Sequence, residues 1–450
     1  MSRPDSRGRP SAGHTGVKMH QIERVDIAIV GGGIAGLVAA NYAARAGRSV
    51  GLFERAENLG GRAQTTVVDD FRLNFGAHAL YVRGANAAIL DELAVELGGS
   101  QPEAARYLAM RGERFFSLPV SALALTGTRL LGTRAKIELG RLYASLGDVD
   151  ADTLDSMALR EWIDGHVSDP PARAVFEAMT RLSTYTNDPG RASAGAVVRQ
   201  LRIAGGGVRY LDGGWQVLVD ALRDRAIEAG AQLETGSPVR RIVIEAGEAA
   251  GIVLAGDRIV RAGSVIVATS LAEAASLSGV DEIAAWAAAA VPVRAAVLDL
   301  AMSTLPNPRH VFALGIDRPT YLSVHSTWAK LAPRGQHVVH LMKYLPPTAD
   351  DRGADEHDLE ELLDLSQPGW RNHVVERRYL PRMTVTGWLP VAAGGGLGGR
   401  PGPAVPGVRN LFVAGDWVGG EGMLSDGAFA SGKQAAGLAA SATVSATAAA

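Results

Sequence analysis

Three glycines near the start of the chain, Gly31, Gly33 and Gly36, have the spacing G-x-G-x-x-G. The first glycine permits a tight turn, the second lets a pyrophosphate approach the backbone, and the third allows a helix to pack closely on a strand. Glu54 follows roughly twenty residues later, where a carboxylate can accept hydrogen bonds from a ribose. This combination of residues predicts a binding site for an adenine dinucleotide.

The surrounding sequence supplies the elements that such a site needs. Asp26 to Val30 and Ser49 to Phe53 are short apolar runs that are typical of buried strands. Between them we expect an alanine-rich helix that begins near Ile34 and directs its N-terminal amides at the phosphates. The candidate cofactor-binding residues of this unit are Gly31, Gly33, Ile34, Ala35, Gly36, Glu54 and Arg55.

A second glycine pair, Gly60 and Gly61, follows the second predicted strand and precedes Arg62. Backbone amides at such glycines can approach a phosphate, and a guanidinium can bind a phosphate through two parallel hydrogen bonds. With these residues the chain resembles the superfamily of flavin-dependent amine oxidases, phytoene desaturases and protoporphyrinogen oxidases, whose members carry the same fingerprint followed by Gly-Gly-Arg. The resemblance implies an α/β fold, with an FAD-binding Rossmann-like domain of interleaved segments and a second, α+β substrate domain.

Two later segments resemble further parts of that superfamily. Asn410 to Ala436 is similar to its C-terminal flavin motif, and Tyr210 to Ile242 is similar to a segment that returns to the cofactor near the adenine. The resemblance implies that FAD also contacts Val239, Gly415, Asp416, Ser425, Asp426, Gly427 and Ala428. A helix that opens near Ser425 would present its amides to the flavin pyrimidine, where reduced flavin carries negative charge. Because the chain has no cysteine, we expect the FAD to be bound non-covalently.

Two residues are candidates for the chemistry beside flavin N5. His78 could accept a proton, because an imidazole titrates near neutral pH. The alternative is that its ring only hydrogen-bonds backbone or a ribityl oxygen. Lys343 could hold a water near N5, as a lysine does in some amine oxidases, and the alternative is a strand lysine that points to solvent. No histidine spacing in the sequence indicates a metal site.

The composition bounds the domain organisation. A chain of 450 residues with 47% hydrophobic and 20% charged residues can form two or three domains with real cores. The formal net charge of −2 and the absence of a clustered basic face argue against nucleic acid as a partner. The expected parts are an FAD domain of residues 25–85, 206–295 and 380–440, a substrate domain of residues 86–205 and 296–379, and disordered tails at residues 1–24 and 441–450.

The predicted location is the cytoplasm. The N-terminal segment lacks the apolar core of a secretory signal, and no run has the length of a transmembrane helix. Basic residues among the leucines of residues 118–146 leave open a peripheral contact with a membrane surface. The alternative for that segment is an ordinary solvated helix face.

The predicted function is an FAD-dependent oxidoreductase, a dehydrogenase or phytoene desaturase-like desaturase. It would transfer a hydride to flavin N5 from a largely apolar small molecule, isoprenoid or polycyclic in character. Gly422 to Leu424 lack the aromatic side chain that amine oxidases carry before the last cofactor helix, and this departure disfavours an amine. An amine or porphyrinogen oxidase is the first alternative, and a non-catalytic flavoprotein scaffold is the second. Oxygen and a quinone both stay open as the electron acceptor.

Overall fold

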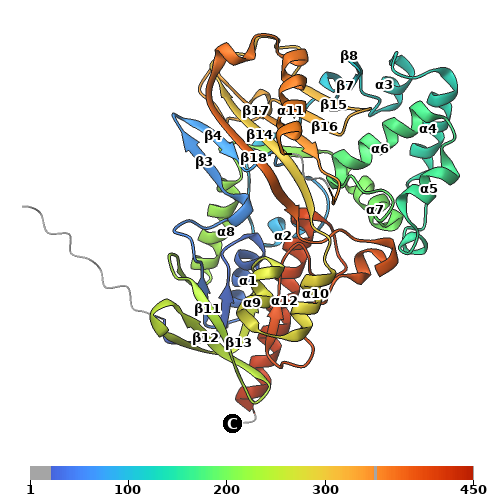
Figure 1. The fold of residues 1–450 in the computed structure, drawn as a ribbon. Coiled ribbons are helices and arrows are strands. Elements are labelled where there is room, and N and C mark those ends of the chain that lie inside the picture. The colour runs from blue at the N-terminus through green and yellow to red at the C-terminus, as the bar shows by residue number, and fades with distance from the viewer. Residues whose placement is uncertain (1–21, 349–351, 449–450) are drawn as a thin grey trace, which may run out of the picture.

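The computed structural model describes residues 22–348 and 352–448. Two large sheets, each with seven strands, lie at opposite ends of the molecule (Figure 1). Most of the predicted N-terminal tail, residues 1–21, lies outside the described residues. Arg24 already belongs to the first strand, so the folded chain begins there or before it.

The first sheet gathers strands from the beginning, the middle and the end of the chain. Its order is β10-β2-β1-β13-β12-β11, and β19 pairs with the second half of β13. The strands β1, β2, β10, β13 and β19 run parallel, while β11 and β12 form an antiparallel edge. The bounds are β1 (Arg24–Val30), β2 (Val50–Phe53), β10 (Gln232–Glu234), β11 (Val239–Glu245), β12 (Glu248–Leu254), β13 (Ile259–Val267) and β19 (Leu411–Val413).

Helices cover this sheet on both faces, as is usual for parallel strands. Because successive side chains of a strand point to opposite faces, β1 buries Ile27 and Ile29 on one side and Ala28 and Val30 on the other. The helices on the first side are α1 (Ile34–Arg45), α2 (Ala85–Glu92), α8 (Gln216–Glu228) and α12 (Leu424–Ala448), and those on the second are α9 (Leu271–Ser278) and α10 (Asp281–Ala289). The predicted α/β class is confirmed.

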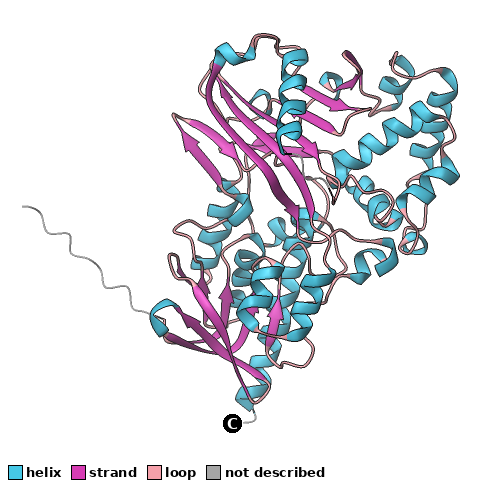
Figure 2. Ribbon diagram, in the orientation of Figure 1, coloured by secondary structure: helices cyan, strands magenta, loops and turns pink. Residues whose placement is uncertain are grey.

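The second sheet is mostly antiparallel and has the order β18-β14-β17-β16-β15-β7-β8. Its strands are β7 (Leu108–Arg111), β8 (Arg114–Ser117), β14 (Val293–Met302), β15 (Phe312–Gly315), β16 (Thr320–Ser323), β17 (His337–Tyr344) and β18 (Val374–Thr386). The single helix α11 (Arg352–Ser366) packs on one face (Figure 2). The helices beside the sheet are α3 (Ala122–Gly127), α4 (Thr133–Ser145), α5 (Leu159–His166), α6 (Pro170–Thr184) and α7 (Ala194–Ala204).

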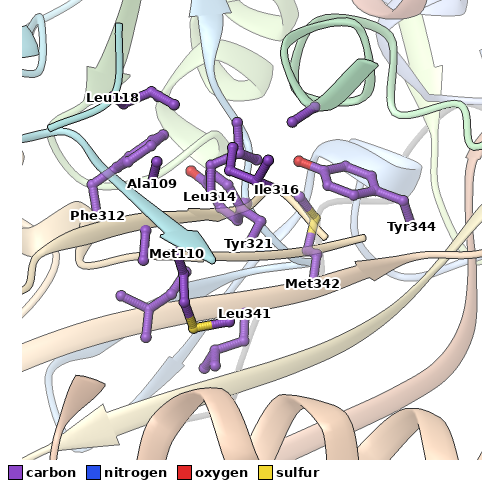
Figure 3. Close-up of a cluster of buried hydrophobic side chains, with 14 of the residues drawn as sticks. Ala109, Met110, Leu118, Phe312, Leu314, Ile316, Tyr321, Leu341, Met342 and Tyr344 are labelled. Carbon is purple, nitrogen blue, oxygen red and sulfur yellow. The ribbon is translucent and has the colours of Figure 1, made fainter. Parts of the chain in front are cut away.

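The two faces of β17 differ in what they contact. In Figure 3, Leu341 and Met342 point to opposite sides of the strand, and Tyr344 points to the same side as Met342. Met342 and Tyr344 join Tyr321 in the buried cluster that fills the interior of this part of the molecule. Residues with even numbers on β17 therefore face the interior, and those with odd numbers face α11.

Two small sheets connect the large ones. One is the hairpin of β3 (Thr65–Val68) and β4 (Phe71–Asn74), and the other joins β5 (Leu80–Tyr81), β9 (Val208–Leu211) and β6 (Gly99–Ser100). The predicted division at 295/296 and at 379/380 falls inside β14 and β18, both of which belong to the second sheet. The predicted tail from residue 441 is wrong as far as Ala448, because α12 continues to that residue. Alanine has the highest helix propensity, which favours this extension.

Candidate active site

The turn between β1 and α1 has the geometry that its glycines predict. Gly31 has a φ of +107°, and a Cβ on Gly36 would lie 2.0 Å from the carbonyl oxygen of Gly31. These two positions therefore require glycine for the backbone itself. A Cβ on Gly33, in contrast, would meet no atom within 4 Å. The open space lies at the start of α1, where no side chain caps the first amides. Ile34 and Ala35 form the first helical turn, so free N–H groups line a cradle that fits a phosphate.

Glu54 lies directly after β2, beside this turn. Its Oε2 accepts a hydrogen bond from the Gly32 amide at 2.7 Å, and its Oε1 accepts one from the Ala56 amide at 2.8 Å. The Ser237 amide donates to the Glu54 carbonyl at 2.8 Å. This contact brings the start of β11, with Val239, close to Glu54, and the contact of Val239 with the cofactor stays a prediction.

Arg55 points elsewhere. Its guanidinium forms an ion pair of 3.2 Å with Glu273 on α9, and 71% of the Arg55 side chain is exposed. The structure therefore does not bring the Arg55 side chain to the glycine turn.

The Gly60–Gly61 pair lies against the first glycine turn. The Gly60 amide donates to the Gly32 carbonyl at 2.8 Å, and a Cβ on Gly61 would lie 3.8 Å from the Gly33 Cα. The two loops thus form one backbone surface. Arg62 extends from its edge and donates to a carboxylate oxygen of Asp416 at 2.8 Å.

Asp416 is buried, and its two oxygens have different surroundings. Oδ2 accepts hydrogen bonds from Arg62 and from the Gly387 amide, at 2.8 and 3.1 Å. Burial opposes ionisation, but the charge of Arg62 and the hydrogen bonds from Arg62, Thr386 and the Gly387 amide together hold the pKa of Asp416 below its usual value. Oδ1 is also buried and has no hydrogen-bond partner among the described residues. An ionised carboxylate with one free oxygen fits an O–H donor such as a ribityl hydroxyl. Gly415, the preceding residue, donates its amide to Ser431 on α12.

Helix α12 begins at Leu424, close to the predicted position. Ser425 and Ala428 are half-buried in its first turn. Asp426 is fully buried and turns away from its own helix, because its Oδ1 accepts a hydrogen bond of 2.8 Å from the Asn86 amide at the start of α2. Burial raises the pKa of Asp426 to about 6. Its side chain caps α2, and any cofactor contact at this position falls to the backbone.

Arg400 is a structural residue of this site that the sequence did not indicate. It is buried, and it donates to the carbonyl oxygens of Asp416 at 3.0 Å and of Gly422 at 2.7 Å. A Cβ on Gly427 would lie 3.1 Å from its Nη1. Burial lowers the pKa of Arg400 to about 10. Arg400 thus shapes the loop that leads into α12, and the one signal for it was a lone arginine between a glycine run and prolines.

His78 lies between the cofactor segments and the second sheet. Its ring contacts Trp215 edge-on at 4.9 Å, and its Nδ1 is 3.2 Å from the Gly76 carbonyl oxygen. Burial lowers the pKa of His78 to about 4, with smaller effects from His340, Asp299 and Arg62 among others. The ring is therefore neutral at pH 7. The backbone contact matches the simpler of the two predicted roles, and proton acceptance stays a prediction.

Lys343 lies on the opposite side of its strand from this region. Its Nζ is 2.7 Å from a carboxylate oxygen of Asp355 and 2.5 Å from one of Asp358, both on α11. The odd-numbered face of β17 packs against α11, which explains this direction. The position does not support the predicted role of Lys343 beside flavin N5.

A buried network on the even-numbered face was missed by the sequence. His340 Nδ1 is 2.6 Å from Asp299 Oδ1, and Arg378 Nη2 is 2.6 Å from Asp299 Oδ2. The Gly76 amide also donates to Asp299 Oδ2 at 3.3 Å. Because Gly76 belongs to the segment of His78, the network joins the second sheet to the cofactor side. Its members come from β14, β17, β18 and the loop after β4, so no local spacing marks it.

The described residues contain neither a candidate metal site nor a helix suited to span a membrane. Within 22–348 and 352–448, no three or more His, Cys, Asp or Glu side chains are grouped so as to hold a metal ion. None of the helices of the described part has both the length and the hydropathy to span a bilayer.

Comparisons with known proteins agree with this geometry. Residues 34–440 match the family model described as flavin containing amine oxidoreductase. A putative flavin-containing monoamine oxidase of Mycobacterium tuberculosis is 30% identical over 54% of this chain and 56% of its own length. A phytoene dehydrogenase of Streptomyces griseus is 27% identical over 48% of each chain. The chain is thus aligned with about half the length of these curated relatives.

Solved structures share the fold over almost the whole chain. An oxidoreductase from Methanosarcina mazei superposes with a TM-score of 0.71 at 23% identity, over 90% of this chain and 98% of that one. A double mutant of putrescine oxidase gives a TM-score of 0.67 at 16% identity, over 93% and 99%. With the family model covering most of its length, the chain belongs to the family of flavin-containing amine oxidoreductases.

Proposed function

We propose that this protein binds FAD non-covalently and oxidises a largely apolar small molecule, isoprenoid or polycyclic in character. The contact that carries the proposal is the 2.8 Å ion pair between Arg62 and Asp416, which lie 354 positions apart. It places the Gly-Gly-Arg segment and the C-terminal segment side by side, as one extended cofactor would require. Bound FAD supplies a hydride acceptor at N5.

The residues present fit FAD at three points. The open space at Gly33 and the uncapped amides of α1 would hold the pyrophosphate. Glu54 would bind the adenosine ribose, and the free Oδ1 of Asp416 would accept a hydrogen bond from the ribityl chain. Because the chain has no cysteine, a thioether link to the flavin is excluded.

The residues around the start of α12 support an apolar substrate. Met423 is buried and packs against Ala196 and Leu397. No aromatic side chain stands at Gly422, Met423 or Leu424, where the resemblance would place part of an amine cage. Several relatives are named as carotenoid or phytoene desaturases, which act on apolar chains by their names.

A second candidate is an oxidase of amines or porphyrinogens. It is favoured by relatives named monoamine oxidase and putrescine oxidase. The two candidates differ in the substrate that reduces the flavin, and each leaves oxygen or a quinone as the final acceptor.

One experiment separates the candidates. The purified protein is reconstituted with FAD and divided into two portions. One portion is precipitated with acid to test whether the flavin is released. The other is mixed anaerobically with apolar polyenes, sterols, amines and a porphyrinogen. We expect free FAD in the acid supernatant and bleaching of the flavin bands by the apolar compounds. Bleaching by amines alone or by the porphyrinogen alone would establish the second candidate, and a protein that binds no FAD would contradict both. Adding oxygen or a quinone to the reduced protein identifies the acceptor.

A further inference from the structure

Two buried histidines at the second sheet have ring nitrogens without a hydrogen-bond partner among the described residues. His340 on β17 and His325 in the short turn His325–Thr327 are both fully buried. His340 Nε2 and both ring nitrogens of His325 form no hydrogen bond with a described residue. Buried polar atoms in proteins are almost always paired with protein, water or ligand. These three nitrogens are therefore available to a polar group from outside the described chain.

Asp299 determines which nitrogen of His340 carries the proton. Asp299 and His340 are direct partners on neighbouring strands, and Asp299 Oδ1 is 2.6 Å from His340 Nδ1. The carboxylate is acceptor-only, so Nδ1 must donate, and in a neutral ring Nε2 then carries the lone pair. His340 thus offers a fixed hydrogen-bond acceptor at Nε2.

Within the described part of the chain, the one carboxylate bonded to His340 already has a cation as a second partner. Arg378 of β18 binds the other oxygen of Asp299 at 2.6 Å and balances its charge. His325 contacts the His340 ring edge-on at 4.6 Å, and burial lowers the pKa of His325 well below its usual value. His78, across from the sheet, is neutral for the same reason. Among the described residues, Asp299 is the one carboxylate hydrogen-bonded to either imidazole of the sheet.

These surroundings select the chemistry of the bound group. An ammonium group would need an anionic partner, and Asp299 is already paired with Arg378. A neutral hydroxyl needs only an acceptor, which His340 Nε2 supplies, and a nearby donor or acceptor, which His325 supplies. Apart from Asp299 and Arg378, the neighbours of the two rings include aromatic and apolar side chains: His325 stacks on Tyr210 at 3.8 Å, and Met342 lies on the same face of β17 as His340. The site thus suits a polar end on an apolar body.

We infer that His340, held by Asp299, and His325 form a subsite that binds a hydroxyl group of the substrate. The inference rests on the proposed function and narrows its substrate class to hydroxylated isoprenoid or polycyclic compounds. The hydroxyl donates to His340 Nε2, and its oxygen lies within reach of His325. His340 and His325 are specificity residues in this scheme, and no bond is made or broken at them.

The test compares an alcohol with its methyl ether, which has the same skeleton and lacks the O–H donor. The probes are farnesol and farnesyl methyl ether, and 5α-cholestanol and its methyl ether. Binding to the FAD-reconstituted protein is measured by calorimetry and by the shift of the flavin absorption bands. We expect at least one alcohol to bind about tenfold more tightly than its ether, since an unpaired polar group in a site built for hydroxyl binding discriminates strongly.

Two variants and one control locate the effect. His340→Asn keeps a donor for Asp299 and removes Nε2, and His325→Phe keeps the stack on Tyr210 and removes both nitrogens. Each should lower the affinity for the alcohol about tenfold and leave that for the ether within twofold. His337→Asn, on the opposite face of the same strand, should preserve the preference. Because His325→Phe keeps Asp299 paired, it tests the subsite even if His340→Asn folds poorly.

The outcomes are distinguishable from failure of the proposed function. Equal binding of alcohol and ether, no binding of either alcohol, or a preference that survives both variants overturns the inference while the FAD spectrum stays intact. A protein without the flavin spectrum, or one that is bleached only by amines, contradicts the proposed function itself.

Discussion

Arg62 and Asp416 form a 2.8 Å ion pair across 354 positions of the chain. The carboxylate is buried, whereas 51% of the arginine side chain is exposed. The pair therefore holds the C-terminal segment against the glycine loops and keeps Asp416 ionised.

Replacing Arg62 by methionine should weaken FAD binding and destabilise the fold. The change leaves the Asp416 carboxylate buried without its cation, which costs about 1–3 kcal/mol of unfolding free energy. We expect the FAD dissociation constant to rise at least tenfold in a fluorescence titration. Arg261→Met is the matched control, since its pair with Glu245 is half-exposed on both sides and should contribute under about 1 kcal/mol. Equal effects of the two changes would contradict a special role for Arg62.

Alanine at Gly33 and at Gly36 should act on different properties. The Gly36→Ala Cβ would collide with the Gly31 carbonyl oxygen, so we expect loss of stability with or without FAD. The Gly33→Ala Cβ meets only open space, and the backbone there, with φ −75°, suits alanine. Gly33→Ala should therefore keep the apo-protein melting temperature and lose FAD affinity at least tenfold. If Gly33→Ala binds FAD normally, the pyrophosphate does not lie at this turn.

The stability of the protein should depend on pH through His78. Burial lowers its pKa to about 4 from an unfolded value of 6.5, so the folded state binds the proton more weakly. The stabilisation that comes from the neutral ring is complete above pH 6.5 and is lost as the pH falls toward 4, by up to about 3 kcal/mol. His78→Gln should reduce this slope in urea unfolding measured at several pH values, and the buried His325 should account for a remaining slope of the same sign.

Asp426 acts with the opposite sign in the same range, and this provides an internal check. Its pKa is raised to about 6, so its contribution is complete below the unfolded value and is lost as the pH rises through 6. Asp426→Asn should therefore steepen the loss of stability on acidification, whereas His78→Gln should flatten it. Parallel changes in the two variants would refute this assignment.

Replacing Lys343 by methionine should lower the stability of the protein and leave the rate of flavin reduction nearly unchanged. The change leaves Asp355 and Asp358 without their shared cation, and we expect a loss of about 1–3 kcal/mol in unfolding free energy. The rate of flavin reduction should stay within twofold in stopped-flow measurements. A rate that falls a hundredfold with an unchanged melting temperature would restore the role beside N5 that the sequence suggested.

The α3–α4 surface should bind anionic membranes. Leu123 is 84% exposed and Ile137 is 48% exposed, and Arg134 and Lys136 lie on the same helix as Ile137. Such a combination of apolar and basic side chains favours anionic lipid. In cosedimentation with phosphatidylglycerol vesicles, Leu123→Asp should at least halve the bound fraction. Val67→Asp, at another exposed apolar position, should not. Equal binding of the wild type and Leu123→Asp to the vesicles would contradict this prediction and indicate that the α3–α4 surface is an ordinary solvated surface.

Local sequence was sufficient to predict the backbone elements of the proposed cofactor site. The turn at Gly31 to Gly36, the strand that ends before Glu54 and the helix that opens near Ser425 could be predicted because each depends on the conformational limits of a few adjacent residues. A glycine with a φ of +107° and a helix start without a side-chain cap each depend on only a few neighbouring residues, and so a short segment is enough to predict them. The role of Gly60 to Arg62 was predicted from a resemblance to a known family, and the structure places this segment beside the turn.

Tertiary structure alone decided the substrate half. Lys343 was a candidate on an apolar strand sequence, but the sequence did not indicate which face of β17 is covered by α11, and it did not identify His340. Asp299, His340 and Arg378 come from three strands whose pairing has no local signature. The role of Arg400 follows only from the folded structure, in which its buried guanidinium donates to the carbonyl oxygens of Asp416 and Gly422. Side-chain alternation determines that a strand has two faces, and only the packing of the whole chain determines which of them lines the site.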